Sequence, residues 1–296
     1  MRIDVSNPVG IRAPNQLESR NEDELTRVRA NPLGIVSALK THWPEYLIEA
    51  SGLGFFMLSA CLFTALLFHP ASPVLAAIET PLLRRLLMGM AMGTTAIAII
   101  YSPWGQRSGA HINPATTLTF FRLGKIARAD ATFYVLAQFL GGLIGVMVAA
   151  KLLGAVISDP SVNYAATLPG DTGPVLAFIA ELVISFLLMS VILRVSNAWG
   201  WEQFTGLFAG LLVAAYITVE SPISGMSMNP ARTFASALPA KSWMSLWIYF
   251  TAPVVGMLAA AEVYRRSGRG KVACAKLHHG NNQRCIFHCA YQGNRT

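Results

Sequence analysis

The sequence predicts an all-α membrane protein with six transmembrane helices and two re-entrant half-helices, arranged as an inverted repeat. Hydrophobic residues make up 53% of the chain and charged residues 13%, against about 25% charged residues in soluble domains. Six apolar stretches are long enough to cross a bilayer as helices. Two further apolar segments, residues 109–123 and 225–238, are too short to cross. Irregular backbone at membrane depth is tolerated where it lines a water-filled cavity, which points to a pore.

The boundaries of the six spans follow from length and flanking residues. Helices that are apolar on every face give little periodic signal, whereas a bilayer core needs about 20 mainly apolar residues. Proline and glycine residues mark the ends of the stretches. The expected spans are residues 45–68, 82–103, 127–152, 174–194, 203–220 and 243–264.

Composition divides the chain into three parts. Residues 1–42 have little apolar content, so we expect a disordered cytoplasmic N-terminus. Residues 43–266 form the membrane domain, with repeat halves of about 43–152 and 172–266. Residues 267–296 form a polar cytoplasmic tail that is rich in Cys and His and is a candidate metal site.

The membrane domain repeats itself. Glu49 opens "EASGLGFFMLS" in the first span of one half, and Glu181 opens "ELVISFLLMS" in the first span of the other. Each half contains three spans and one short segment. Because the number of spans per half is odd, the second half inserts upside down, and the two short segments meet at the midplane from opposite faces.

The basic residues favour one orientation in the cell membrane. Most of the 23 Arg and Lys residues lie before the first span, in the tail and in connections on that same side, so the positive-inside rule places both termini in the cytoplasm. Arg84 and Arg85 fall on the other side. The net charge of +8 comes without a nucleic-acid-binding motif, so we expect a lipid bilayer and no nucleic acid as partner.

Each short segment contains an Asn-Pro-Ala triplet with the sequence of a helix start. Asn is a good cap, and Pro suits the first helical position, where no amide hydrogen is needed. Ordinary caps in soluble loops are the alternative, but the matching places in the two halves favour a pore. In the inverted repeat the positive helix ends face each other and oppose cations, while the Asn amides donate to a solute oxygen. The triplets are Asn113-Pro114-Ala115 and Asn229-Pro230-Ala231.

The segments around the triplets, "SGAHINPATTL" and "SGMSMNPARTFASA", closely resemble the signatures of the aquaporin (major intrinsic protein) family. The resemblance covers about residues 45–265. It implies an aquaporin-like fold with an hourglass pore, and a homotetramer with one pore per subunit. It also implies a passive water channel that rejects ions and protons, needs no cofactor for transport and is not an enzyme.

Arg232 follows the second triplet within an apolar membrane segment, where an ionisable residue is a functional candidate because its insertion is unfavourable. By resemblance it is the arginine of the family's outer constriction; a structural ion pair is the alternative. Spacing gives Met92, Ile217 and Met226 as the other constriction residues, with a one-residue insertion assumed for Met92. Water-selective members carry Phe, His and a small or polar residue there, so glycerol, ammonia and hydrogen peroxide remain alternative solutes. Thr233, where glycerol-conducting members have Asp, favours water.

Buried polar residues have structural roles by the same resemblance. Glu49 and Glu181 need hydrogen-bond partners within the membrane and are expected to brace the re-entrant loops, and Gln138 to take part in similar bonding. A membrane enzyme that uses Glu49 and Glu181 as acid and base is a remote alternative. His111, just before the first triplet, is a candidate gating residue, or simply bonds a backbone group.

The tail contains six soft metal ligands in a short, polar segment. Thiolate and imidazole suit zinc, and four such ligands close a structural site that folds a segment without a core of its own. Incidental Cys and His in a disordered, lipid-binding tail, or thiol-based redox sensing, are the alternatives. A metal- or redox-responsive sensor on a channel scaffold is thus a second class of function. The candidate ligands are Cys274, His278, His279, Cys285, His288 and Cys289.

Overall fold

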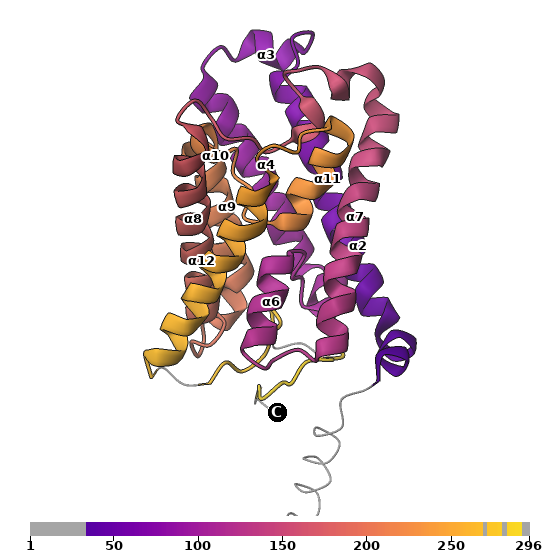
Figure 1. Cartoon of the computed structure of the whole chain (residues 1–296), viewed down its shortest axis with the longest axis vertical. Coiled ribbons are helices and arrows are strands. Elements are labelled where there is room, and N and C mark those ends of the chain that lie inside the picture. Colours follow the sequence, from indigo (N-terminus) through magenta and orange to yellow (C-terminus); the bar gives the residue numbers. More distant parts are fainter. Residues whose placement is uncertain (1–33, 269–270, 280–282, 292–296) are drawn as a thin grey trace, which may run out of the picture.

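The computed structural model describes residues 34–268, 271–279 and 283–291, and its membrane domain is built of helices joined by loops and turns. Among the described residues, six helices are long and apolar enough to cross a membrane, as the sequence predicts. Two short helices lie among them at the positions of the triplets (Figure 1). The long helices are α2 (Ile35–Phe68), α4 (Pro81–Tyr101), α7 (Arg128–Leu153), α8 (Gly173–Val195), α9 (Thr205–Val219) and α12 (Leu246–Arg266).

The short elements connect the spans or enter between them. The half-helices are α6 (Pro114–Arg122) and α11 (Pro230–Ala240), which lie one above the other in Figure 1. Each follows a one-turn helix that ends at a left-handed glycine, Gly109 or Gly225. The other short elements are α3 (Pro73–Ala77), α5 (Pro103–Ser108), α10 (Ser221–Ser224) and the 3-10 turns η1 (Gly154–Ser158), η2 (Asn163–Ala165) and η3 (Glu202–Phe204).

Helix packing follows the internal repeat. In the first half α2 packs along α7, in the second half α8 packs along α12, and α4 and α9 pack against each other across the two halves. The half-helix α6 contacts α7 and α12, as does α11. This is the arrangement expected of an inverted repeat, with the half-helices enclosed by the long ones.

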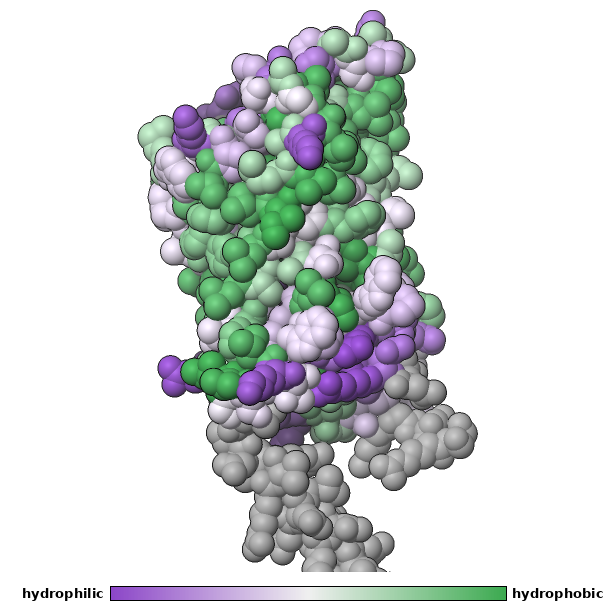
Figure 2. Space-filling view, turned by 90° about the vertical axis from the view of Figure 1, so that its right-hand side faces the viewer, coloured by the Kyte–Doolittle hydropathy of each residue, from purple (hydrophilic) through white to green (hydrophobic). Residues whose placement is uncertain are grey.

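The surface has the pattern of a protein that crosses a bilayer. Figure 2 shows a broad apolar band between polar ends. Large apolar side chains such as Phe55, Leu140 and Ile144 are more than half exposed on the outside of α2 and α7. Helix α2 begins and α12 ends at the same face, where the described tail residues also lie (Figure 1). We call this the tail face, and the face that holds α3, η1 and η2 the far face.

The first helix begins earlier than the sequence suggested. We expected residues 1–42 to be disordered, but α2 begins at Ile35 and continues through Pro44. Proline removes one helical hydrogen bond, which tertiary contacts can offset. The expectation is therefore wrong for residues 35–42, while residues 1–33 lie outside the described part of the chain.

Buried polar contacts hold this first stretch of α2 against its neighbours. The imidazole of His42 lies 2.7 Å from a carboxylate oxygen of Asp130, at the start of α7, and the hydroxyl of Tyr46 donates to the same oxygen at 2.5 Å. The guanidinium of Arg107 donates to buried Glu45 at 2.9 Å. Paired, buried polar groups of this kind specify where a helix docks, and they are long-range contacts that local sequence does not reveal.

Glycine allows α2 and α7 to approach closely. A Cβ atom at Gly141 would overlap the carbonyl group of Ala50 on α2. Small residues at such crossings are typical of membrane helices, whose association depends on close packing. We expect Gly141→Leu to lower the free energy of unfolding by about 3 kcal/mol or more, since the helices must separate. The midpoint of thermal unfolding in detergent measures this.

The matched control for that substitution is Gly34→Leu. A Cβ at Gly34 would meet nothing within 4 Å. We expect this variant to unfold near the wild-type midpoint. An equal loss of stability in the two variants would contradict the close-packing role of Gly141.

Candidate functional site

Both half-helices begin with an asparagine cap. The side-chain oxygen of Asn113 accepts a hydrogen bond from the amide of Ala115 at 2.9 Å. That of Asn229 accepts from the amides of Ala231 at 3.1 Å and Arg232 at 3.2 Å. Proline occupies the first helical position in each case, as expected for an Asn-Pro start.

The side-chain amides of the two asparagines cross-link the two loops. The Nδ2 group of Asn113 donates to the carbonyl of Met228 at 2.7 Å, and that of Asn229 donates to the carbonyl of Ile112 at 2.8 Å. Each asparagine thus holds the residue that precedes the other one. The starts of the two half-helices are therefore fixed to each other.

A buried glutamate braces the first loop. One carboxylate oxygen of Glu49 accepts from the hydroxyl of Ser108 at 2.8 Å and the amide of His111 at 3.0 Å. The other accepts from the amide of Ile112 at 2.6 Å and the side-chain amide of Gln138 at 2.9 Å. Charge-assisted bonds of this kind satisfy a carboxylate in an apolar environment.

The second loop has the same brace. Glu181 accepts from the hydroxyl of Ser224 at 2.8 Å, from the amide of Ser227 at 2.6 Å and from the amide of Met228 at 2.7 Å. Each carboxylate holds the loop of its own half. The two do not form an acid and base pair, which removes the basis of the enzymatic alternative.

The braces hold backbone that is otherwise unfavourable. Ala110, Ile112, Met226 and Met228 all have φ between 41° and 54°, a region that residues with a side chain rarely occupy. Such conformations persist where the surroundings over-determine them, and here glutamate bonds the amides of Ile112 and Met228.

A serine and a tyrosine in each half complete the brace, and sequence reasoning missed both pairs. The hydroxyl of Tyr134 donates to the carbonyl of Ser108 at 2.7 Å, and that of Tyr249 donates to the carbonyl of Ser224 at 2.5 Å. The Ser-Gly dipeptide at the same distance before each triplet was the available signal. The tyrosines lie far along the chain and gave none.

A cavity of about 370 Å³ runs past both asparagines. Its lining includes the four expected constriction residues, so the spacing argument placed all of them on one cavity. Phe56, Val162 and Leu277 extend the lining to α2, to the far-face loop and to the tail. The expected residues among the lining are Met92, Asn113, Ile217, Met226, Asn229 and Arg232.

Arg232 is held by backbone. Its guanidinium donates to the carbonyl of Ala165 in η2 at 2.8 Å. Within the described ranges it forms no ion pair with a carboxylate, so the ion-pair alternative finds no support there. Thr233, next to it, is buried, and its hydroxyl lies 2.8 Å from that of Thr167. The positive charge of Arg232 therefore remains available to the cavity.

The structure brings four of the six expected tail ligands together. Cys274, His279, Cys285 and Cys289 place one ligand atom each within 4.8 Å of all the others. His278 instead lies edge-on to Tyr101, with a centroid distance of 4.9 Å. The imidazole of His288 lies 2.9 Å from the carbonyl of Gly124.

The environment shifts the titration of groups in this cluster. Hydrogen bonding from Cys274, together with Cys285, lowers the pKa of the Cys289 thiol, whereas the contact with Cys285 raises that of Cys274. Burial lowers the pKa of Lys276, whose ammonium group donates to the carbonyls of Gln283 and Arg284 at 3.2 and 2.8 Å. Thiol and imidazole groups brought together in this way are ligands that suit a soft metal ion.

The chain is similar to known proteins in part of its sequence and in its fold. The chain is 36% identical over 176 residues to a probable NIP-type aquaporin of Nicotiana alata, covering 58% of this chain and 62% of that protein. It is 37% identical over 191 residues to a glycerol uptake facilitator protein-like protein of Lactiplantibacillus plantarum, covering 62% of this chain and 85% of that one. The solved aquaglyceroporin of Plasmodium falciparum superposes with a TM-score of 0.64 at 21% identity, over 76% of this chain and 96% of that one.

The match extends along most of the membrane domain. The chain spans about three fifths of the length of the plant aquaporins that it matches. The likeness to the Plasmodium structure shows a common fold. The family model for major intrinsic proteins matches residues 38–264, which include all six spans and both half-helices apart from the ends of the first and last. The chain therefore belongs to the major intrinsic protein family of membrane channels.

Proposed function

We propose that this chain conducts water passively and in both directions down an osmotic gradient, and rejects ions and protons. One observation carries the proposal: Asn113, Asn229 and Arg232 line a single cavity between the starts of two half-helices. The chain belongs to a family of channels, not enzymes. Transport of this kind needs no cofactor, because nothing is converted.

In this proposal, the side-chain amides of the two asparagines donate hydrogen bonds to the solute. Each side-chain amide nitrogen carries two hydrogens, and one of them is bonded to the opposite loop. The second is available to a solute oxygen in the cavity. For a neutral solute, the hydrogen bonds from the asparagines thus replace part of its hydration shell. A cation finds only hydrogen-bond donors there and no negative charge to replace its hydration.

The cation barrier has two sources. The positive ends of the α6 and α11 dipoles point at the same place, where the asparagines lie. Arg232 adds a full positive charge to the lining of the cavity. We assign the constriction to Arg232 with Met92, Ile217 and Met226, and the bracing of the loops to Glu49, Glu181 and Gln138.

Glycerol or another small neutral solute, such as ammonia or hydrogen peroxide, is the second candidate. The constriction is apolar apart from Arg232, since Met92, Ile217 and Met226 line the cavity there. An apolar wall suits the carbon chain of glycerol. One relative is named as a glycerol uptake facilitator protein-like protein, so glycerol is tested alongside water.

Osmotic shrinkage of proteoliposomes distinguishes the two solutes. We expect liposomes with full-length protein to shrink faster than empty ones in sucrose, and to shrink without re-swelling in glycerol. The measurement is made with and without a metal chelator, because the tail residue Leu277 lines one end of the cavity. Re-swelling in glycerol would identify a glycerol pore. Shrinkage at the empty-liposome rate in both conditions would contradict any water pore.

The cellular setting completes the proposal. The chain is a multi-pass protein, and we place it in the cell membrane with both termini cytoplasmic, because Arg107, Arg122, Lys125 and Arg194 lie at the tail face with the basic tail. We propose a homotetramer with one pore per subunit. Its mass after purification in a mild detergent tests this, and a monomer would contradict it.

A further inference from the structure

The tail covers one end of the cavity. Its described residues, 271–279 and 283–291, lie across the tail face (Figure 1). The amide of Leu277 donates to the carbonyl of Gly109 at 3.1 Å, and the carbonyl of Ala275 lies 2.8 Å from Nε2 of His111. Gly109 and His111 belong to the loop that leads to the first triplet. The tail is thus bonded directly to the re-entrant loop.

Two apolar side chains of the tail fill this end. Leu277 is 5% exposed and lines the same cavity as the asparagines. The ring of Phe287, 6% exposed, stacks on that of His111 at a centroid distance of 5.4 Å. A Cβ atom at Gly109 would lie 2.8 Å from Phe287. Leu277 therefore stands where a solute would leave the cavity, and Phe287 packs beside it.

The tail is attached at several places around the mouth. The amide of His288 donates to the carbonyl of Lys125 at 2.9 Å, after α6. The amide of Ala273 donates to the side chain of Asn197 at 2.7 Å, after α8. The Tyr291 hydroxyl lies 3.1 Å from Glu202. The contacts reach loops of both halves, so the segment forms a cap and does not merely rest on one helix.

The tail segment that forms this cap is too short to build a hydrophobic core of its own. The described tail residues form no helix or strand. Short segments without regular structure usually need a disulfide or a metal to hold one shape. The buried ammonium group of Lys276 donates to two backbone carbonyls of the cap. These hydrogen bonds stabilise the cap but do not cross-link the segment between Cys274 and Cys289.

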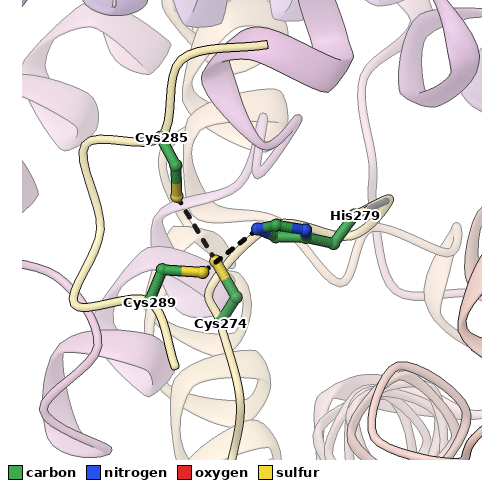
Figure 3. Close-up of side chains that lie close together, drawn as sticks. All are labelled: Cys274, His279, Cys285 and Cys289. Atoms are coloured by element: carbon green, nitrogen blue, oxygen red, sulfur yellow. Dashed lines mark hydrogen bonds between the residues drawn. The ribbon is translucent and has the colours of Figure 1, made fainter. Parts of the chain in front are cut away.

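The four-residue cluster supplies the missing cross-link. Figure 3 shows Cys274, His279, Cys285 and Cys289 pointing toward one another. The sulfurs of Cys274 and Cys285 are 3.5 Å apart, and the sulfur of Cys289 lies 3.1 Å from Nε2 of His279. Tetrahedral zinc, with Zn–S bonds of about 2.3 Å, places its sulfur ligands about 3.8 Å apart. Three thiols and one imidazole form a complete structural zinc set without an open position.

We propose that Cys274, His279, Cys285 and Cys289 bind one zinc ion, which holds the tail as a cap, with Leu277 in the mouth of the cavity. The zinc-bound protein is closed, and loss of zinc opens it. The regulatory part rests on the proposed pore, whereas the metal site does not. A ligand can shift such an equilibrium because it binds only the capped state.

Metal content tests the site. Full-length protein purified in zinc-containing buffer is expected to hold one zinc per chain by elemental analysis, and cobalt substitution to give the visible bands of a tetrahedral thiolate site. Cys274→Ser combined with Cys285→Ser is expected to abolish zinc binding, because it removes two of the four ligands of a tetrahedral site. The matched control is His288→Ala, a tail histidine outside the cluster, which should retain zinc.

Water flow tests the cap. In proteoliposomes, a membrane-permeant chelator is expected to raise the rate of shrinkage about tenfold in the wild type, the factor given by a preference of about 1.4 kcal/mol for the capped state. Zinc added back should restore the slow rate. Leu277→Ala should keep its zinc and yet conduct fast, because it removes the side chain in the mouth and none of the ligands.

Four results would overturn parts of the proposal. Wild-type protein without zinc and without cobalt bands would eliminate the metal site, as would a Cys274–Cys285 disulfide found by non-reducing mass spectrometry. Bound zinc with equal flow before and after chelation would eliminate the cap as a regulator. Flow at the empty-liposome rate in the Cys274→Ser, Cys285→Ser variant and in Leu277→Ala would contradict the pore itself, while zinc content would still decide the site.

Discussion

Replacing Glu181 by Leu is expected to prevent the channel from folding. The carboxylate accepts three hydrogen bonds from Ser224, Ser227 and Met228, and all three donors are buried. An orphaned buried donor costs about 1–3 kcal/mol, so the total approaches the whole stability of an ordinary domain. We expect little monodisperse protein in detergent, and a much lower midpoint of thermal unfolding in what is recovered.

Two variants show whether the effect comes from the lost acceptor. Glu181→Gln keeps one acceptor oxygen and should fall between the wild type and Glu181→Leu. Glu262→Leu removes a carboxylate that pairs with Arg266 at 2.9 Å on the outside of the tail face, where ion pairs contribute about 0–1 kcal/mol. It should unfold near the wild-type midpoint. A Glu181→Leu variant that is as stable as Glu262→Leu would contradict the bracing role.

Replacing Arg232 by Val is expected to let cations enter the pore while water still passes. The guanidinium lines the cavity and is bonded to the carbonyl of Ala165, without a carboxylate partner among the described residues. A unit charge at about 4 Å contributes about 4 kcal/mol at an effective dielectric constant of 20, which corresponds to about a thousandfold in cation entry. Proton and potassium flux in dye-loaded proteoliposomes under a diffusion potential measures this, beside osmotic shrinkage.

The controls separate charge from shape. Arg232→Lys keeps the charge and should retain most of the barrier. Arg194→Ala removes an exposed positive charge at the end of α8, outside the cavity, and should exclude cations as the wild type does. If Arg232→Val and Arg194→Ala excluded cations equally well, the barrier would have to be assigned to the helix dipoles alone.

The role of the repeated triplets could be predicted from the sequence because helix capping depends on neighbouring residues. An Asn-Pro pair favours a helix start, and two such starts at matching places in a chain with six apolar stretches leave few arrangements. The residues expected at the constriction, Met92, Ile217 and Met226, were chosen from spacing along the chain, and each lines the cavity.

The start of α2 and the brace partners were not readable, because they depend on residues far apart. Helix α2 begins at Ile35. In its first turns the imidazole of His42 contacts the carboxylate of Asp130, which is 88 positions away in the sequence. Tyr134 completes the brace of Ser108 from a different helix. A hydrogen bond between remote residues leaves no periodic or local pattern, and Pro44 suggested a boundary that tertiary contacts override.

In the tail, the properties that the sequence determined are clearly separate from those that the tertiary structure decided. Composition alone showed a cluster of soft ligands in a short polar segment, because residue type fixes which metals a side chain suits. It did not show which four of the six come together, nor that Leu277 lines the same cavity as Asn113 and His111. Those facts depend on where the tail meets loops from both halves of the membrane domain. The helix-forming and membrane-spanning properties are local to each segment and were fixed by the sequence, whereas the cap exists only in the packed molecule.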